Sequence, residues 1–291
     1  MNVFSIIVIY NPNISQLKAC VASLFPQSEK IIIVKNSEER LDDDFKSEKI
    51  VQVQLDKNYG IAYAQNRGIE MAIADNADFV LFSDQDTVFP VDFVGQSLMC
   101  YERHRNEKIA AVVPFFYNEN KKQYARISVA KTRTILPENG KEYYVSHAIS
   151  SGTVCPAAVF ETVGMMNERL FIDWVDTEWC WRATDAGYKL VCDTKNIIHH
   201  SMGDDFRTVF GRKIVVYSDF RNYFFLRNGI YLLLHSHLLS FSEKLPFCSF
   251  MIKKTGLFVI TSGFRLKSFK TFYKALKKGL SNKFSLEEEL K

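Results

Sequence analysis

Short apolar runs alternate with helix-spaced segments along the first 113 residues. Four runs have the length of a buried strand, and they are Val3–Ile9, Lys30–Val34, Phe79–Phe82 and Ile109–Val113. A further segment, Ile50–Leu55, alternates apolar and polar residues, which predicts a strand with one wetter face. Apolar residues at helical spacing predict helices between these strands, at Ile14–Leu24, Gly60–Ala74 and Val91–His104.

This order of elements is typical of an α/β protein. The pattern β-α-β-β-α-β-α-β predicts a mostly parallel sheet flanked by helices. Residues 115–150 have a strand-like pattern, and two later helices are predicted at Pro156–Val163 and Val175–Ala186. From Asp219 to the C-terminus the pattern is helical, with a break expected at Pro246.

Composition excludes several classes of protein. The 291 residues are 47% apolar and 24% charged, which is enough for a sizeable core and excludes a disordered chain. The net charge of +4 is too small to indicate nucleic-acid binding. The six cysteines are scattered without a CxxC pair, which favours core positions in a reducing compartment. No GxxxxGK[ST] segment is present, which excludes a P-loop, and the first strand is not followed by GxGxxG, which disfavours a dinucleotide site.

No apolar segment of the sequence has the length of a membrane span. The first apolar run lacks a basic flank and a cleavage site, so it predicts a strand rather than a signal peptide. The runs near 229–242 and 256–264 are interrupted by polar residues and fall short of the roughly 20 residues that a span needs. We therefore expect a chain that is soluble or lies on a membrane surface.

Polar side chains follow each of the first four predicted strands. They are Asn11, Asn36 and Asn58 after the first three, and Asp84 with Asp86 after the fourth. The carboxyl ends of parallel strands meet at one edge of a sheet, where α/β proteins bind their ligands. Two carboxylates in the sequence SDQD can share Mg²⁺ or Mn²⁺, which prefer oxygen ligands and bridge to phosphates. The alternative is a solvated surface turn.

Acidic and aromatic residues crowd the segment from Phe171 to Arg182, which contains three acids and three tryptophans. Asp176 and Glu178 stand at a predicted helix start, where the helix dipole favours carboxylates, so one interpretation is helix capping. The other interpretation is a general base in an aromatic wall that binds a ring-shaped substrate. Paired histidines, His199 and His200, end another apolar run and offer either one metal ligand or a structural side chain.

Together these segments resemble a known enzyme family. The chain is similar to inverting glycosyltransferases of family 2 with the GT-A fold, especially bacterial rhamnosyltransferases of surface polysaccharide (O-antigen type) synthesis. The matching segments, in order, are VIYNP at 8–12, VKNS at 34–37, NYGIAYAQNRGI at 58–69, SDQDT at 83–87, SSG at 150–152, FIDWVDTEWCWRATDAGY at 171–188, HSMGDD at 200–205 and RNYFFLRN at 221–228. The set covers about 220 residues and is specific as a whole, although no single member is.

The resemblance implies a role for each matching residue. Asp176 would be the catalytic base, and the metal would be held by Asp84, Asp86 and His200. The nucleotide sugar would lie against Tyr10, Asn11, Pro12, Asn36, Asn58, Gly60, Asn66, Asp84, Gln85, Arg221 and Arg227, the two arginines neutralising the diphosphate. The acceptor would lie near Ser151, Gly152, Trp174 and Glu178.

The resemblance also implies a domain organisation and a reaction. Residues 1–228 would form the GT-A catalytic domain, with a nucleotide-sugar half at 1–113 and an acceptor half at 114–228, followed by a basic helical extension at 229–291. The enzyme would move L-rhamnose from dTDP-L-rhamnose to a glycan on a polyprenyl diphosphate, with Mg²⁺ or Mn²⁺. One position departs from the family, which usually has Asp where this chain has Lys35, so a UDP-sugar donor is the alternative.

Two rival functions follow from the same residues. A nucleotidyltransferase would also use a carboxylate-bound metal, but it needs a basic Gly-rich loop that the N-terminal region lacks. A membrane-surface protein with a nucleotide fold and no catalysis is the second rival, and the presence of Asp84, Asp86, Asp176 and His200 argues against it.

The C-terminal region differs in charge from the rest of the chain. Residues 241–291 hold 11 Lys+Arg and 4 Asp+Glu, a net +7, which leaves −3 for residues 1–240. Helices are predicted at Ile230–Leu239, Phe247–Ile260 and Phe264–Leu280. The last has an apolar stripe of Phe264, Leu266, Phe269, Phe272, Tyr273 and Leu276 among five lysines. That pattern predicts a helix on an anionic membrane, on the cytoplasmic face of the bacterial plasma membrane. The alternatives are packing on the catalytic domain or a homodimer contact.

Overall fold

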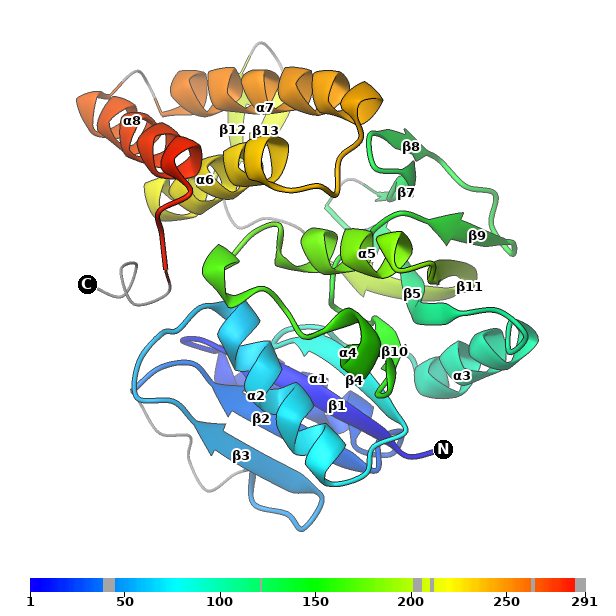
Figure 1. Cartoon of the computed structure of the whole chain (residues 1–291). Helices are drawn as coiled ribbons and strands as arrows, with labels where there is room; N and C mark the ends of the chain where they lie inside the picture. Colours follow the sequence, from blue (N-terminus) through cyan, green and yellow to red (C-terminus); the bar gives the residue numbers. More distant parts are fainter. Residues whose placement is uncertain (39–44, 121, 201–205, 210–211, 263–264, 286–291) are drawn as a thin grey trace.

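A mixed sheet forms the centre of the molecule (Figure 1). The computed structural model describes residues 1–38, 45–120, 122–200, 206–209, 212–262 and 265–285, with side chains throughout except at 200, 206–209 and 212–215. Within these ranges the strands lie in the order β3-β2-β1-β4-β10-β5-β11-β9, with β6 beside β5. Their bounds are β1 Val3–Ile9, β2 Lys30–Lys35, β3 Ile50–Gln54, β4 Phe79–Asp84, β5 Ile109–Asn118, β6 Gln123–Tyr124, β9 Glu142–Val145, β10 Val154–Pro156 and β11 Lys189–His200.

The sheet is mostly parallel, which confirms the predicted fold class. Strands β3, β2, β1 and β4 are all parallel to one another, and β11 is parallel to β5. The short strand β10 runs antiparallel between β4 and β5, and β9 closes the far edge antiparallel to β11. The carboxyl ends of β1 to β4 therefore meet at one edge of the sheet, where the polar residues that follow these strands were expected to gather.

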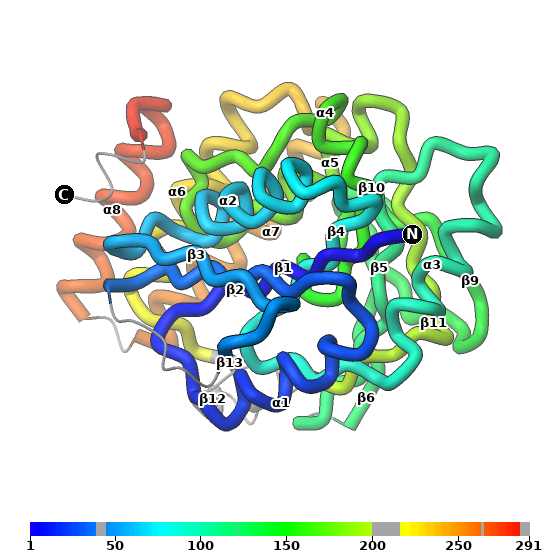
Figure 2. The backbone as a smooth tube through the Cα atoms, turned by 90° about the horizontal axis from the view of Figure 1, so that it is seen from below, coloured from blue at the N-terminus to red at the C-terminus, as the bar shows by residue number. Residues whose placement is uncertain are grey.

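Helices cover both faces of this sheet. Helices α1 (Ile14–Leu24) and α3 (Phe93–Arg103) pack on one face, and α2 (Ile61–Ala74), α4 (Val159–Val163) and α5 (Val175–Asp185) pack on the other. Each face of the sheet has its own apolar core, and successive residues of a strand point into opposite cores. Ile6 packs in the core on the α2 side, and Ile7 packs in the core on the α1 side. Figure 2 shows α2 and α1 on opposite sides of β1 to β3.

A third layer of helices lies above the sheet in Figure 1. It contains α6 (Asp219–His235), α7 (Phe241–Thr261) and α8 (Leu266–Ser281), preceded by the hairpin of β12 (Phe206–Val209) and β13 (Arg212–Val215). A second hairpin pairs β7 (Ile127–Ala130) with β8 (Arg133–Ile135), and a 3₁₀ turn, η2, covers Glu168–Leu170. The three helices share an apolar core with Phe171 and Trp181, so this layer packs directly on the segment that carries Asp176.

The C-terminal helices differ from the predicted ones in their bounds. The helix predicted at Ile230–Leu239 is the second half of α6, which ends at His235, so the predicted boundary after residue 228 lies inside a helix. The break predicted at Pro246 was wrong, because α7 begins at Phe241 behind a capping box of Ser240 and Glu243. Packing of apolar side chains of α7 into the shared core offsets the roughly 3 kcal/mol cost of an internal proline. Phe264, expected in the last helix, lies outside the described residues.

Candidate active site

The ends of β1 and β4 are joined by a glutamine side chain. The backbone N–H of Tyr10 donates to Gln85 Oε1 at 2.8 Å, and Gln85 Nε2 donates to the Tyr10 carbonyl at 3.3 Å. Tyr10 keeps an exposed ring, and Asn11 beside it has a left-handed backbone with φ of 46°. Tyr10, Asn11 and Pro12 therefore lie at the edge next to the acidic turn, with an aromatic face available for a planar base.

The ends of β2 and β3 are joined in the same way by two asparagines. Asn36 Nδ2 donates to Asn58 Oδ1 at 3.0 Å, and Asn36 Oδ1 accepts from the backbone N–H of Tyr59 at 2.8 Å. Asn58 Oδ1 also accepts from the Gly60 N–H at 2.9 Å. Because Gly60 has φ of 85° and lies against Phe171, a side chain there would collide with the Phe171 backbone. These contacts bring the residues predicted at 36, 58 and 60 together.

The acidic turn at the end of β4 is supported from the β10 side. Ser151 Oγ accepts from the Asp84 N–H at 3.1 Å and lies 2.9 Å from Thr87 Oγ1. Ser151 was predicted to lie near the acceptor. It is buried instead, and its hydroxyl group supports the turn. Asp84 is half-buried, whereas Asp86 is exposed and its carboxylate makes no hydrogen bond or ion pair within the described ranges. An exposed carboxylate beside a fixed turn fits a hard cation.

Asp176 lies in the first turn of α5, and two backbone amides hold its carboxylate. Its Oδ1 accepts from the Thr177 N–H at 2.8 Å and its Oδ2 from the Ser150 N–H at 3.2 Å. Burial raises the pKa of this carboxyl from 3.8 to about 6. The amide hydrogen bonds oppose that rise, and the negative charges of Asp173 and Asp84 add to it. Asp84 and Asp176, 92 positions apart in the chain, therefore act on one another within one site.

The segment before Asp176 has a strained backbone. Phe171, Asp173 and Trp174 have φ values of 63°, 60° and 67°, which are unfavourable for residues with a Cβ. Asn228, fully buried in α6, donates through Nδ2 to the carbonyls of Leu170, Ile172 and Asp173 at 2.8, 2.9 and 3.0 Å. The helical layer therefore fixes the turn that presents Asp173 and Asp176.

Arg221 faces this acidic cluster from the start of α6. Its Nε lies 3.1 Å from Asp173 Oδ1, and its guanidinium stacks over Tyr217. Burial raises the pKa of the Asp173 carboxyl, and the charge of Arg221 opposes the rise. Asp84 also acts on Arg221 electrostatically. Arg221 therefore places a positive charge beside Asp173 and Asp84, and its predicted contact with a diphosphate stays a prediction. Asp173 stands inside the FIDWVD segment, but no local pattern indicates its ion pair with Arg221, which lies 48 positions away.

Two residues predicted to bind the donor support the scaffold instead. Asn66 is buried in α2 and hydrogen-bonds the backbone of Met166 in both directions, at 3.0 and 2.9 Å. Arg227 is fully buried, donates to the carbonyls of Arg169 and Leu170, and lies over the Phe284 ring. A fully buried guanidinium cannot meet a diphosphate, so we assign Arg227 to the support of η2.

Three residues predicted to contact the acceptor also have structural contacts. Glu178 is buried and ion-paired with Arg182 at 2.9 Å, which makes it an unsuitable substitute for Asp176. Trp174 donates from Nε1 to the Phe225 carbonyl at 3.0 Å and packs among aromatic rings of α6 and α7. Gly152 has φ of 76° and lies so close to Ile198 that a Cβ would collide with its side chain. The aromatic wall thus joins the segment that carries Asp176 to the helical layer.

The third predicted metal ligand cannot be placed. His200 ends β11 and pairs with Asn118 through the backbone, but its side chain lies outside the described residues. In the described part of the chain, ligand atoms of Cys100, His104 and Glu142 come within 4.8 Å of one another. That cluster forms an ion-pair network with Arg103 and Glu107, beyond the C-terminal end of α3, and it is not part of this site.

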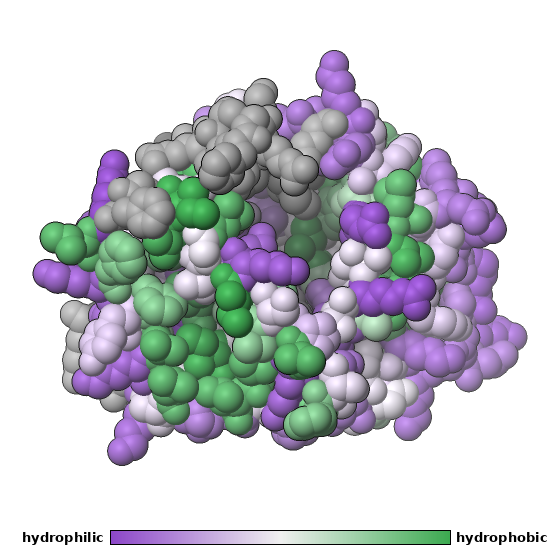
Figure 3. All heavy atoms as spheres, turned by 90° about the horizontal axis from the view of Figure 1, so that it is seen from above, coloured by the Kyte–Doolittle hydropathy of each residue, from purple (hydrophilic) through white to green (hydrophobic). Residues whose placement is uncertain are grey.

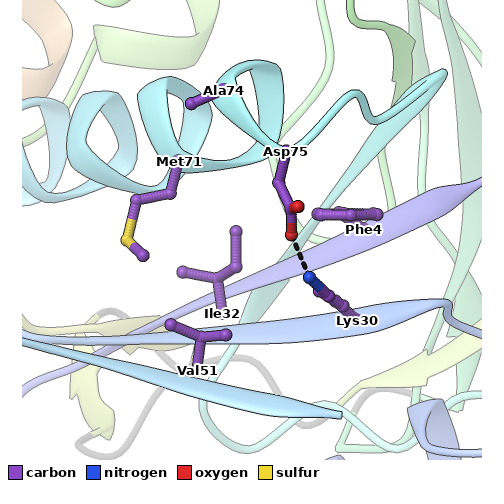
Figure 4. Close-up of a pocket in the computed structure, with 7 residues that line it drawn as sticks. All are labelled: Phe4, Lys30, Ile32, Val51, Met71, Ala74 and Asp75. Carbon is purple, nitrogen blue, oxygen red and sulfur yellow. Dashed lines mark hydrogen bonds and ion pairs between the residues drawn. The ribbon is translucent and has the colours of Figure 1, made fainter. Parts of the chain in front are cut away.

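A cavity of about 230 Å³ lies at the opposite end of the strands (Figure 4). It is mainly apolar, and the ion pair of Lys30 with Asp75 lies at its side. Its lining residues are Phe4, Lys30, Ile32, Val51, Met71, Ala74 and Asp75. Because these residues lie near the amino ends of β1 and β2, the cavity is separate from the strand-end site.

Comparison with known proteins agrees with this geometry. Residues 5–164 match the family described as glycosyl transferase family 2. The chain is 35% identical over 249 residues to the dTDP-rhamnosyl transferase RfbF of Shigella flexneri, an alignment that covers 81% of each chain. Among solved structures, TarS 1-349 of S. aureus in complex with UDP-GlcNAc superimposes with a TM-score of 0.61 at 14% identity, covering 96% of this chain and 80% of that one. GalNAc-T7 with UDP, GalNAc and Mn²⁺ gives 0.56 at 14% identity, covering 91% of this chain and 58% of that one.

The fold and the matches define a sugar-transferring enzyme with the GT-A fold. The chain belongs to glycosyl transferase family 2. The family resemblance that the sequence motifs carried is thereby confirmed, together with the fold and the enzyme class. The site residues assembled above at the carboxyl ends of β1 to β4 and at the start of α5 are its candidate active site.

Proposed function

We propose that this enzyme transfers L-rhamnose from dTDP-L-rhamnose to a glycan carried by a polyprenyl diphosphate, with inversion at the anomeric carbon. The observation that carries the mechanism is the Asp176 carboxylate, which is held by two backbone amides next to Asp84. The donor is supported by the 35% identity with a dTDP-rhamnosyl transferase over 81% of the chain.

Asp176 acts as the general base in this proposal. It accepts the proton of the acceptor hydroxyl while that oxygen attacks the anomeric carbon from the face opposite the leaving nucleotide. The bond from the anomeric carbon to the diphosphate oxygen breaks in the same displacement, and the electron pair leaves with the dTDP. One displacement inverts the anomeric carbon and needs no covalent enzyme intermediate. A pKa of about 6 leaves most of the carboxylate ionised at neutral pH yet makes it a better base than an ordinary aspartate.

The other strand ends hold the donor. Asp86, with Asp84 and the expected His200, would hold Mg²⁺ or Mn²⁺. The carboxylate of Asp86, which is exposed and has no partner among the described residues, fits such an ion. When bound, the cation offsets the charge that develops on the departing diphosphate. Arg221 offers a second positive charge, and its guanidinium would leave Asp173 to pair with the diphosphate. Tyr10 and the Asn36–Asn58 pair face the nucleoside.

A UDP-sugar donor is the alternative, and one observation favours it. Lys35, where the family usually has Asp, is buried at the end of β2 directly before Asn36. A base contact made by Asp elsewhere in the family must therefore come from a neighbouring residue here. Comparing the binding of dTDP-L-rhamnose with that of UDP-sugars distinguishes the two donors.

The helical layer offers a surface for the membrane that carries such an acceptor. No helix within the described ranges is long and apolar enough to span a bilayer. On α7, Phe241 is 95% exposed and Leu245 is 78% exposed, and on α8 Leu266 is 81% exposed. Exposed lysines lie on the same helices, at 253, 254, 267, 270, 274 and 277. Figure 3 shows apolar side chains gathered among polar ones on this face. We place the enzyme on the cytoplasmic face of the plasma membrane, bound through apolar contact and lysine attraction to anionic lipid.

Thermal denaturation with nucleotide sugars tests the donor site. A ligand that binds the folded state raises the melting temperature by mass action, so dTDP-L-rhamnose with Mn²⁺ should raise it more than UDP-sugars or Mn²⁺ alone. Asp86→Ala should keep the melting temperature of the free protein, because this carboxylate is exposed, and should lose the Mn²⁺-dependent part of the shift. Glu70→Ala, which removes a half-buried carboxylate that is paired with Arg67 in α2, is the control. A shift indifferent to EDTA and to Asp86→Ala would show that the metal assignment is wrong.

A further inference from the structure

A cavity of about 320 Å³ lies between β5, the β7–β8 hairpin, the segment after β9 and the start of α5. It is on the α5 side of the sheet, in the half of the chain predicted to bind the acceptor. None of the contacts that place the donor involves its lining. It is also distinct from the small cavity of Figure 4, which lies at the amino ends of the strands.

The cavity adjoins the backbone that holds the Asp176 carboxylate. Thr177 lines it, and the Thr177 N–H is one of the two amides that hold Asp176. Ile149 also lines it and directly precedes Ser150, whose N–H is the other amide. A ring that fills the cavity therefore lies beside the backbone that holds Asp176, on the side of α5 and β9, whereas the donor site lies at the ends of β1 to β4.

The chemistry of the wall limits what can fill it. Most lining residues are apolar, among them Val113, Phe115 and Ile127, and no carboxylate lines the cavity among the described residues. The polar members of the lining are Arg126, Ser128, His147 and Thr177, and the Arg126 guanidinium already donates to Thr134. A hydroxyl group turned toward the apolar part of the wall would lose its hydrogen bonds to water without a replacement, which weakens binding. A methyl group in the same place loses no hydrogen bond and gains from burial. The wall therefore favours a sugar with an apolar substituent.

His147 supplies one fixed polar contact in this wall. Its Nδ1 accepts from Trp181 Nε1 at 3.3 Å, so the neutral ring carries its proton on Nε2. Burial lowers the pKa of His147 to about 4, which keeps the ring neutral at physiological pH. Within the part of the chain that the structure describes, Nε2 has no hydrogen-bond partner. It is a donor for one oxygen of a ligand.

We infer that this cavity is the subsite for the acceptor sugar, and that it selects a residue carrying an apolar substituent, either a 6-deoxy methyl or an acetamido methyl, over one with a hydroxyl at that position. His147 Nε2–H donates to an oxygen of the same residue. The inference rests on the proposed function, because only glycosyl transfer makes Asp176 a base toward this cavity. It names a class of acceptor that the comparisons leave open.

Binding of four methyl glycosides to the full chain without donor tests the subsite. Saturation-transfer NMR compares the glycosides of N-acetylglucosamine and glucose, which differ by the acetamido group, and those of L-rhamnose and L-mannose, which differ by the 6-hydroxyl. In at least one of the two pairs, we expect the sugar that carries the methyl group (N-acetylglucosamine or L-rhamnose) to bind at least about threefold more tightly than the hydroxylated sugar of that pair. Ala148→Phe, which fills the cavity, should abolish that signal, whereas Ala130→Phe on the exposed end of β7 should leave it unchanged. His147→Phe should weaken binding and His147→Gln, which keeps an N–H donor, should weaken it less.

Equal binding within both pairs, absence of binding by all four sugars, or unchanged binding by Ala148→Phe would overturn the inference. Circular dichroism confirms that each variant is folded. Donor binding is measured separately on the wild-type chain by its thermal shift with dTDP-L-rhamnose. A lost donor shift with intact sugar selectivity contradicts the proposed function, and an intact donor shift without sugar selectivity contradicts the subsite, so the two failures are distinguishable.

Discussion

At the scale of residues, the site depends on how a carboxylate is buried while two amides hold it. Asp176 keeps its orientation through the N–H groups of Thr177 and Ser150, and its raised pKa comes chiefly from burial. The sequence could predict Asp176, Asp84 and Asp86 because acids at a helix start and a strand end have recognisable patterns. It could not separate Arg221 from Arg227, because both stand in one motif and only packing shows that Arg227 is fully buried.

The pH dependence of transfer follows from Asp176. A protonated carboxyl cannot accept a proton, so kcat/KM should fall about tenfold per pH unit below an apparent pKa of about 6. The raised pKa has the opposite effect on folding. Protonation of this buried group favours the folded state, so its stabilising contribution is complete below pH 3.8 and disappears as the pH rises through 6. Kinetics from pH 4.5 to 8, with circular dichroism at each pH, check the expectation. An acid limb near pH 4 would contradict the burial of Asp176 in the working enzyme.

At the scale of elements, the strands and helices of the first 113 residues were predictable and the elements that support the site from a distance were not. Apolar runs of strand length predicted β1, β2, β4 and β5, because parallel strands buried on both faces leave that pattern. Nothing local predicted that α6 would hold the strained turn before α5. That contact joins Asn228 to Leu170, Ile172 and Asp173 across more than 50 positions.

Removing the Asn228 side chain tests that support. Asn228→Ala should remove the side-chain donor of the Ile172 and Asp173 carbonyls and one of the acceptors of Arg227, which should lower the free energy of unfolding by about 2–4 kcal/mol and reduce transfer. Asn222→Ala, in the exposed first turn of the same helix, should cost less than about 1 kcal/mol. Urea unfolding of both variants measures the difference. Equal destabilisation would show that the turn before α5 does not depend on α6.

At the scale of the whole molecule, the helical layer both completes the core and presents an apolar, basic surface. The sequence predicted an amphipathic last helix, and the structure divides its stripe. Phe272 packs against the shared core, whereas Leu266, Phe269 and Tyr273 are exposed. The residues of α8 that are buried against α6 include Gly279, which is not part of the predicted stripe. The strongly exposed Phe241 and Leu245 belong to α7, whose early start the sequence pattern did not indicate. Amphipathic spacing alone does not say which part of an apolar stripe a neighbouring helix covers.

Sedimentation with liposomes tests the membrane surface. The wild-type chain should sediment with anionic liposomes at low salt, and high salt should release part of it, because screening weakens the charge term only. Phe241→Gln combined with Leu245→Gln should reduce binding at least about tenfold, while donor binding persists. Val91→Gln, a site 88% exposed before α3, is the control. Point substitutions are preferable to deletion of residues 264–291, because Phe284 is buried against Arg227. Absence of wild-type binding at low salt would leave the layer as a packing or dimer element.

The central claim is that Asp176 is the base of a single inverting displacement. The most direct measurement is the rate of rhamnosyl transfer from dTDP-L-rhamnose to a polyprenyl-linked acceptor by Asp176→Asn, determined with the donor affinity of the same variant. The substitution is nearly isosteric and removes the proton acceptor, so transfer should fall about 10²–10⁴-fold while donor affinity stays within about threefold of wild type. Transfer within about threefold of the wild-type rate would contradict the account, because it would place the base at a residue other than Asp176.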